Sequence, residues 1–300
     1  MSHPHTQSAD LAAQSRKLGK VGIWSMELRF GDSSLAREVM AELEELGFGA
    51  VWIPGGVGGD FLSDVGRLLD ATKHITIGTG ILNIYKHEPA DVGKWWHGRS
   101  ETDRARLMLG LGVSHGPLIG AGYRKPLGAM DSYLDGLDAA AVPPARRCLA
   151  ALGPRMLELA RRRTAGSHPY LVTPEHTAVA RGILGPAALL APEQGVILET
   201  DPSKAREAAR SALVHYLQLP NYLDNWRRLG FSEDDVTKAT DRLVDGLFAW
   251  GTLTQIAARV QEHLAAGADH VCLQVIHAKG ATMQPPREAW RALAPMLVGR

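Results

Sequence analysis

The chain has 300 residues, of which 45% are hydrophobic and 22% are charged, and its formal net charge is +1. This composition is typical of a globular protein, and the near-zero charge argues against nucleic acid or an anionic membrane surface as its main partner. No apolar run approaches the roughly 18 residues of a membrane-spanning helix, and the N-terminal segment lacks the apolar core of a signal peptide. We therefore expect a cytoplasmic protein with a flexible lead-in over residues 1–19 and a single domain over residues 20–300.

Eight strand-like runs follow one another along the chain, and several are continuously apolar rather than alternating. A continuously apolar run is typical of a parallel strand that is buried on both faces. The runs cover residues 20–25, 50–54, 75–84, 107–113, 147–152, 169–172, 195–200 and 270–276.

Helical patterns separate these runs. Residues 35–46 place Val39 and Leu43 on one face and end at Gly47, which is typical of a helix stop. Thr173-Pro174 and Asp201-Pro202 each combine a capping residue with a proline, as at the start of a helix. Further helices are expected over residues 61–73, 154–163, 252–266 and 286–297.

The alternation of eight strands with helices predicts an α/β protein of the (β/α)8 TIM-barrel type. A doubly wound open sheet is the alternative, although such a sheet usually has fewer strands. Residues 219–251 lie between the seventh and eighth strands and are too long for an ordinary barrel loop. They predict a helical insertion, before the eighth strand, that covers the site.

The two cysteines, Cys148 and Cys272, each lie inside an apolar strand-like run. This position favours buried thiols over a disulfide. His270 and Cys272 can share one strand face, but the histidines are otherwise scattered, and we expect no metal site.

Two of the predicted strands carry paired glycines near their ends. Gly78 and Gly80 mark one strand, and Gly110 and Gly112 mark the other, which ends in Ser114 and His115. Glycines in such positions indicate close approach of the backbone to a flat ligand. The sequence GLGVSHG has the wrong spacing for a dinucleotide fingerprint, and the chain has no phosphate-loop, HExxH or CxxC motif.

Catalytic groups of a barrel lie at the carboxyl ends of its strands. In this chain these ends hold few carboxylates and many small or apolar residues, which favours a large planar cofactor. His115 ends the fourth strand, and an imidazole titrates near neutral pH, so we expect it to act as general acid or base. The helix that begins at Gly153-Pro154 offers backbone N–H groups to a phosphate.

Six segments together carry a family resemblance: IGTGILNIY, LMLGLGVSHGPLI, AALGPRMLELA, HPYLVTPEHTA, LLAPEQGVILETDP and LPNYLDNWRRLGF. The chain resembles the bacterial-luciferase-like flavin and deazaflavin oxidoreductases over about residues 20–276, and within them a group usually described as coenzyme F420-dependent oxidoreductases. The resemblance implies a (β/α)8 barrel, commonly a homodimer, that holds a deazaflavin or FMN ring at the strand ends.

The resemblance also implies roles for particular residues. It places a non-prolyl cis peptide bond at Gly80-Ile81, behind the ring, and a proton-handling side chain at His115. It places the cofactor phosphate at Gly153 and Pro154. The chain departs from the family pattern at Gly55-Gly56, where relatives often carry an acidic or histidine side chain, and at Trp95-Trp96.

From these observations we expect an enzyme that transfers a hydride between coenzyme F420 and a small organic substrate. The alternatives are an FMN-dependent monooxygenase that uses dioxygen and a non-catalytic cofactor-binding barrel, which only Gly55-Gly56 supports. His115 is the expected catalytic residue, and Tyr222, Trp226 and Trp250 are expected to contact the substrate. The residues expected to contact the cofactor are Ser25, Gly55, Gly80, Ile81, Asn83, Gly112, Val113, Ser114, Leu152, Gly153 and Pro154.

Overall fold

The computed structural model describes residues 18–56, 58–278, 280 and 282–299. Most of the predicted flexible lead-in, residues 1–17, lies outside the described residues. Its last two residues are packed, because Leu18 is fully buried and the Gly19 carbonyl accepts a hydrogen bond of 2.8 Å from His270 Nδ1. Leu18 and Gly19 therefore belong to the folded barrel.

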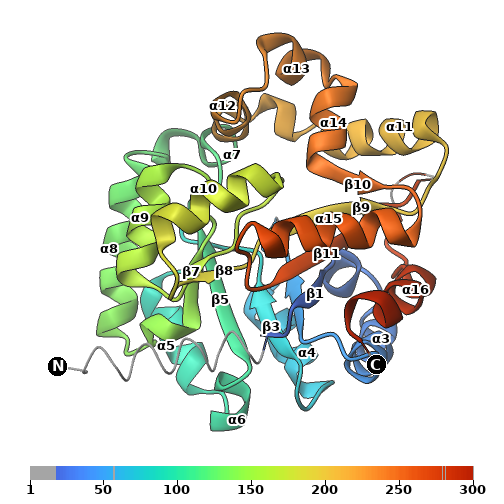
Figure 1. The fold of residues 1–300 in the computed structure, drawn as a ribbon. Coiled ribbons are helices and arrows are strands. Elements are labelled where there is room, and N and C mark those ends of the chain that lie inside the picture. The colour runs from blue at the N-terminus through green and yellow to red at the C-terminus, as the bar shows by residue number, and fades with distance from the viewer. Residues whose placement is uncertain (1–17, 57, 279, 281, 300) are drawn as a thin grey trace.

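Parallel strands follow one another around a barrel in chain order (Figure 1). Each strand pairs with the next one along the chain, and the last pairs with the first. The strands are β1 (Val21–Trp24), β2 (Ala50–Ile53), β3 (Thr76–Thr79) with β4 (Leu82–Asn83), β5 (Leu107–Gly112), β6 (Arg147–Leu149), β7 (Gly166–Ser167), β8 (Leu189–Leu190) with β9 (Glu193–Ile197), and β11 (Val271–Val275).

The barrel closes through the stretch that contains β8 and β9. β8 pairs with β7, whereas β9 pairs with β11. Between them, the Leu190 and Pro192 carbonyls accept hydrogen bonds of 2.9 Å from the backbone N–H groups of Asp269 and Cys272. β8 and β9 therefore act as one bent strand, and the predicted closed (β/α)8 barrel is confirmed.

Helices connect successive strands and cover the outside of the barrel (Figure 1). Two predicted caps are present, since the Thr173 hydroxyl accepts from the His176 N–H and the Asp201 carboxylate accepts from the Ser203 N–H. The helices are α2 (Glu27–Phe30), α3 (Ser33–Glu45), α4 (Phe61–Asp70), α5 (Pro89–His97), α6 (Glu101–Arg104), α7 (Gly116–Ile119), α8 (Pro126–Ala139), α9 (Pro154–Arg163), α10 (Pro174–Leu184), α11 (Pro202–Leu213), α12 (Pro220–Arg228), α13 (Glu233–Lys238), α14 (Asp241–Leu247), α15 (Leu253–Ala265) and α16 (Arg287–Leu297).

The sixth strand differs from the prediction. Residues 169–172 are not a strand, and β7 lies earlier, at Gly166–Ser167. Pro169 has no N–H to donate to a ladder, and Leu171 has a φ of 52°, which takes the backbone out of the extended region. His168 and Tyr170 consequently lie beyond the carboxyl end of β7.

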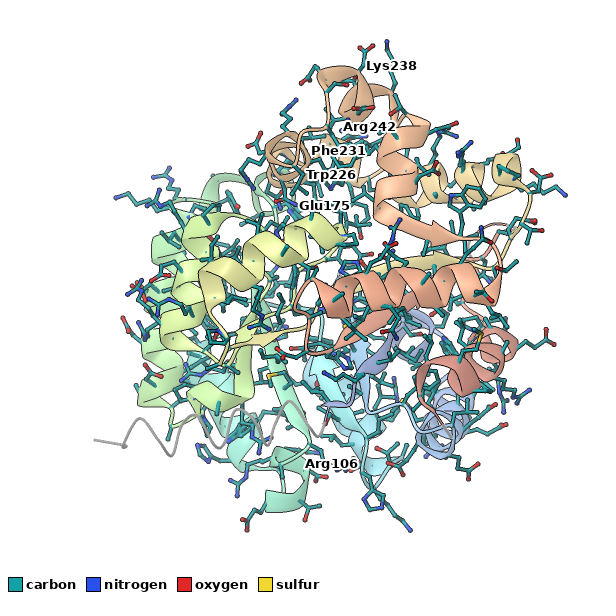
Figure 2. The ribbon with its side chains drawn as sticks, in the orientation of Figure 1. Arg106, Glu175, Trp226, Phe231, Lys238 and Arg242 are labelled. Atoms are coloured by element: carbon teal, nitrogen blue, oxygen red, sulfur yellow. The ribbon has the colours of Figure 1, made fainter. Side chains whose placement is uncertain are left out.

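The segment predicted as an insertion, residues 219–251, contains α12, α13 and α14 and lies over the strand ends (Figures 1 and 2). Its last residues form a strand that the sequence did not predict, β10 (Phe248–Trp250), which pairs in parallel with β9. Trp226 is fully buried and its Nε1–H donates to the Leu171 carbonyl at 3.1 Å. This hydrogen bond attaches the insertion to the barrel.

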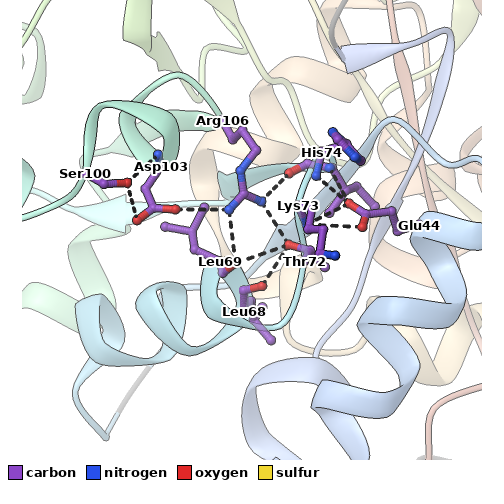
Figure 3. Close-up of polar contacts among 10 residues, drawn as sticks. Glu44, Leu68, Leu69, Thr72, Lys73, His74, Ser100, Asp103 and Arg106 are labelled. Carbon is purple, nitrogen blue, oxygen red and sulfur yellow. Dashed lines mark hydrogen bonds and ion pairs between the residues drawn. The ribbon is translucent and has the colours of Figure 1, made fainter.

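The opposite, amino end of the barrel is held by a buried arginine. Arg106 donates to the Thr72 hydroxyl at 2.9 Å, to the Leu69 carbonyl at 3.0 Å and to the Asp103 carboxylate at 3.0 Å (Figure 3). Nearby, the Glu44 carboxylate accepts from the backbone N–H groups of residues 73–75. Figure 2 shows Arg106 at the end of the molecule away from the insertion. Apart from Arg106 Nε, which has no partner among the described residues, the polar groups of this cluster pair within the protein. This pairing fits a stabilising rather than a chemical role.

The barrel interior holds both cysteines, Cys148 and Cys272, packed with Trp52 and Met108. Both thiols are free and buried, so this prediction is confirmed. None of the described helices is long and apolar enough to span a membrane.

Candidate functional site

A cavity of about 400 Å³ opens at the carboxyl ends of the strands. The strand ends line its base, and η3 (Tyr216–Gln218) and α12 contribute its far wall. Ten of the residues predicted for the site line it: Gly55, Gly80, Ile81, Asn83, Gly112, Val113, Ser114, His115, Leu152 and Tyr222.

The other predicted site residues do not line this cavity. The Ser25 hydroxyl accepts from the Leu28 N–H at 3.2 Å, at the start of α2. Trp226, in α12 of the insertion, is fully buried. Trp250 donates to the Asp245 carboxylate at 2.8 Å. Gly153 and Pro154 begin α9, directly after Leu152. The functional roles of these five residues stay predictions.

A second hollow, of about 500 Å³, lies between the end of β11 and α16. Both of its arginines are already paired, since Arg287 contacts Glu38 and Glu42, and Arg291 contacts Glu42. The cavity at the strand ends is therefore the better candidate for chemistry.

Other protein atoms occupy most of the space in which the paired glycines lack a side chain. A Cβ at Gly78 would lie 2.3 Å from the Trp52 ring, and one at Gly110 would lie 2.0 Å from the Thr79 carbonyl oxygen. A Cβ at Gly112 would lie 2.7 Å from the Ile81 side chain. The prediction that these glycines mark contact with a ligand is thus wrong for Gly78 and Gly110, because protein atoms occupy the space.

The Gly80-Ile81 peptide bond is cis, as the resemblance implies. The Ile81 carbonyl points at Gly55, where a Cβ would lie 2.0 Å from the carbonyl oxygen. The glycine at position 55 therefore has a structural reason, which is to accommodate this carbonyl. The departure from the family pattern at Gly55 does not by itself indicate lost activity.

His115 joins the end of β5 to the insertion. Its Nδ1 lies 3.0 Å from Asn221 Oδ1, and its ring centroid lies 5.4 Å from that of Tyr222. Burial lowers the pKa of His115, and the hydrogen bond to Asn221 partly opposes this effect. The imidazole is therefore neutral near pH 7, with Nδ1–H donating to Asn221 and Nε2 carrying a lone pair.

Aromatic side chains form one wall of the cavity. Trp24 and Tyr170 lie with ring centroids 5.3 Å apart, Tyr170 and Tyr216 5.5 Å apart, and Tyr216 and Tyr222 5.1 Å apart. Burial raises the pKa of Tyr170 and Tyr222 well above the usual value, so both phenols stay neutral. The wall is an uncharged surface against which a planar group can pack.

Several lining residues were not among the predicted site residues: Trp24, His168, Tyr170, Tyr216 and Asn221. Trp24 stands at a predicted strand end, which was a usable signal. His168 and Tyr170 were hidden by the misplaced sixth strand. Tyr216 and Asn221 reach the cavity only through tertiary folding.

The start of α9 is positioned to receive an anion. No side chain among the described residues caps it, and Pro154 occupies its first turn. The guanidinium of Arg228, from α12, comes within 3.6 Å of the position that a Cβ on Gly153 would take. A helix N-terminus and a cation together attract a phosphate. Within the described part of the chain, no group of three or more His, Cys, Asp or Glu side chains is arranged to hold a metal ion.

The parallel barrel, with its cavity at the strand ends, has the luciferase-like α/β-barrel fold of oxidoreductases and monooxygenases. The family model for luciferase-like monooxygenases matches residues 31–270. The chain therefore belongs to the luciferase-like monooxygenase family. A comparison with curated proteins gave no match.

Solved structures share this fold at low sequence identity. An F420-dependent secondary alcohol dehydrogenase, in complex with an F420-acetone adduct, is 15% identical with a TM-score of 0.68, and the match covers 93% of this chain and 98% of that one. The coenzyme F420-dependent tetrahydromethanopterin reductase of Methanopyrus kandleri is 14% identical with a TM-score of 0.66, covering 93% and 97%. The oxygenating constituent of 3,6-diketocamphane monooxygenase from Pseudomonas putida, in complex with FMN, is 11% identical with a TM-score of 0.65, covering 93% and 97%.

Proposed function

We propose that the chain is an oxidoreductase that transfers a hydride between coenzyme F420 and a small organic substrate. The observation that carries the proposal is the cavity at the strand ends, which is lined by the Gly80-Ile81 peptide and by uncharged aromatic side chains. Two of the similar structures are F420-dependent enzymes. A planar ring suits such a cavity better than a sugar or a bare phosphate.

The residues present fit a phosphate-bearing ring cofactor. Leu152 lines the cavity and is followed directly by the α9 start, where Arg228 lies close to Gly153. The ring would lie beside Gly80, which lines the cavity. The start of α9 and Arg228 would hold the phosphate.

When bound, F420 supplies the ring carbon that accepts or donates the hydride. Neutral His115 exchanges a proton with the substrate through Nε2, while Asn221 holds the imidazole in one orientation. Tyr216, from η3, and Tyr222, from α12, cover the cavity and exclude water from the reacting groups.

FMN is the second candidate cofactor, with monooxygenation as the corresponding reaction. The family description names monooxygenases, and one similar structure contains FMN. Both cofactors present a fused planar ring and a phosphate, so the same cavity and the same helix start serve either.

Titration of the purified protein with F420 and with FMN, followed by fluorescence quenching, tests the proposal. We expect F420 to bind more tightly than FMN. A panel of small alcohols and ketones, followed by the absorbance of oxidised F420, then identifies the substrate class. Absence of binding to both cofactors would refute the proposed function. The predicted homodimer is tested on the same preparation by sedimentation.

A further inference from the structure

Two buried nitrogens border the space in front of Gly80. A Cβ at Gly80 would lie 2.6 Å from Trp24 Nε1 and 3.0 Å from His168 Nε2. Trp24 is 5% exposed and His168 is 1% exposed, and both line the cavity. Neither nitrogen has a hydrogen-bond partner among the residues that the structure describes. Leaving a buried polar atom unpaired costs about 1–3 kcal/mol, so a pair of them at the base of a cavity points to a ligand.

The two nitrogens have opposite hydrogen-bonding character. The indole Nε1–H of Trp24 can only donate. His168 Nδ1 lies 2.7 Å from the Ala191 carbonyl, which requires the proton on Nδ1 and leaves Nε2 as an acceptor. The His168 ring is also held by stacking on Trp52, with centroids 4.2 Å apart and planes 15° apart. The base of the cavity thus presents one fixed donor and one fixed acceptor.

The group that fits this pair is uncharged and carries both an acceptor and a donor. Burial lowers the pKa of His168 to about 4, so His168 offers no positive charge at neutral pH. His270, which interacts electrostatically with His168, accepts from Trp52 Nε1–H at 3.3 Å and is likewise neutral. A phosphate, a carboxylate or an ionised phenol would be unfavourable here.

We propose that Trp24 and His168 are positioning residues that hold the pyrimidine edge of the bound ring. Trp24 donates to a ring carbonyl, and His168 accepts from the adjacent ring N–H at position 3. This inference rests on the proposed function, which places the ring beside Gly80. It fixes which end of the ring enters the barrel. FMN and F420 share this amide edge, whereas their other ends differ.

The test compares FMN with its N3-methyl derivative, which keeps the phosphate and the ring but lacks the N–H donor. We expect methylation to weaken binding to the parent protein about 10- to 100-fold. In His168→Phe, which keeps an aromatic ring against Trp52, FMN should bind as weakly as the methylated compound. In Trp24→Phe both compounds should weaken by a similar factor, and the difference between them should remain.

Trp290→Phe is the matched control. Trp290 is also buried, 2% exposed, and its Nε1 has no partner within the described residues, but it does not line the cavity. This variant should bind both compounds as the parent does, and melting temperatures of all variants report on folding.

Three results would overturn the inference while leaving the proposed function intact. One is equal binding of FMN and its N3-methyl derivative to the parent. Another is FMN binding to folded Trp24→Phe as tightly as to the parent, which also decides the matter if His168→Phe does not fold. The third is a protein that binds F420 but not FMN. The two rings differ at the end opposite the pyrimidine edge, where only F420 carries a phenol, so this result would indicate that the phenol end lies at the base of the cavity. Failure of the parent to bind either cofactor would instead refute the proposed function.

Discussion

The side chains of His115 and Asn221 connect two parts of the chain that are far apart in sequence. His115 follows β5, Asn221 is in α12, and their Nδ1 and Oδ1 atoms lie 3.0 Å apart. The hydrogen bond both attaches the insertion to the barrel end and leaves the Nε2 atom of His115 as a base. Closure of the cavity and the orientation of its titratable group therefore depend on the same contact.

His115→Ala is expected to lower turnover by about 10²- to 10⁴-fold, which is the usual size of a general acid–base contribution. Cofactor affinity should change little, because the ring and the phosphate are held by other residues. His115→Gln should behave in the same way, since an amide forms hydrogen bonds but does not titrate. Turnover and melting temperature are measured on the same preparations, and full turnover of a folded His115→Ala protein would remove His115 from the mechanism.

The pH dependence of turnover provides an independent readout of the same residue. Burial lowers the pKa of His115 from 6.5, and Asn221 only partly opposes this effect. If the neutral form is the base, kcat/KM should be constant around pH 7–8 and should fall as the pH drops below the lowered pKa. The acid limb should disappear in His115→Gln. An acid limb that persists unchanged in this variant would assign it to another group.

Arg228→Ala is expected to weaken FMN binding about 10- to 100-fold, because a contact to a charged group contributes about 1.5–3 kcal/mol. Binding of riboflavin, which lacks the phosphate, should be unaffected. Arg227→Ala is the control, since Arg227 is on the same helix but pairs with Glu233 at 2.7 Å. Equal losses for FMN and riboflavin in Arg228→Ala would place the phosphate elsewhere.

The barrel was predictable from the sequence because continuously apolar runs report burial on both faces of a parallel sheet. His115 was predictable because it follows such a run directly. The sixth strand was misplaced because β7 has only two residues, and the apolar residues after it, such as Leu171, lie in a turn. Because of this error, His168 was not recognised as a residue at a strand end.

Residues contributed by tertiary contacts were beyond sequence reasoning. Asn221 is 106 positions from His115, and Arg228 approaches Gly153 only because α12 folds over the barrel. The glycines were misinterpreted for a related reason. A glycine in a strand indicates that another group approaches the backbone closely. The sequence does not tell whether this group belongs to a ligand or, as at Gly110, to a neighbouring strand.

Gly110→Ala and Gly182→Ala should change stability in opposite directions. A Cβ at Gly110 would lie 2.0 Å from the Thr79 carbonyl oxygen, so β3 and β5 would have to separate and the protein should be strongly destabilised. Gly182 is exposed in α10, with no atom within 4 Å of the added Cβ, so alanine there should stabilise by up to about 1 kcal/mol. Urea denaturation measures both effects. A Gly110→Ala protein as stable as the parent would contradict the packing described for these strands.

Glu193 is expected to make stability decrease as pH rises towards 8. Its side chain is 1% exposed, Oε2 accepts from the Leu171 N–H at 3.0 Å, and Oε1 has no partner among the residues described. Burial raises the pKa of Glu193 from 4.5 to about 8, although the Leu171 hydrogen bond opposes this. A carboxyl group whose pKa is higher in the folded than in the unfolded protein stabilises the fold at pH values below its unfolded-state pKa. This stabilisation is lost as the pH rises through its folded-state pKa.

Between pH 5 and 8 the folded parent must therefore keep a proton on Glu193 that the unfolded chain releases. Glu193→Gln has no proton to keep, and its amide oxygen can still accept from Leu171. Its free energy of unfolding, relative to that of the parent, should rise by up to about 1.4 kcal/mol per pH unit across this range. Glu207→Gln, at an exposed position of α11, should show no such trend. Urea denaturation of the three proteins at several pH values measures the difference, and a difference that stays constant with pH would mean that Glu193 is ionised in the folded protein.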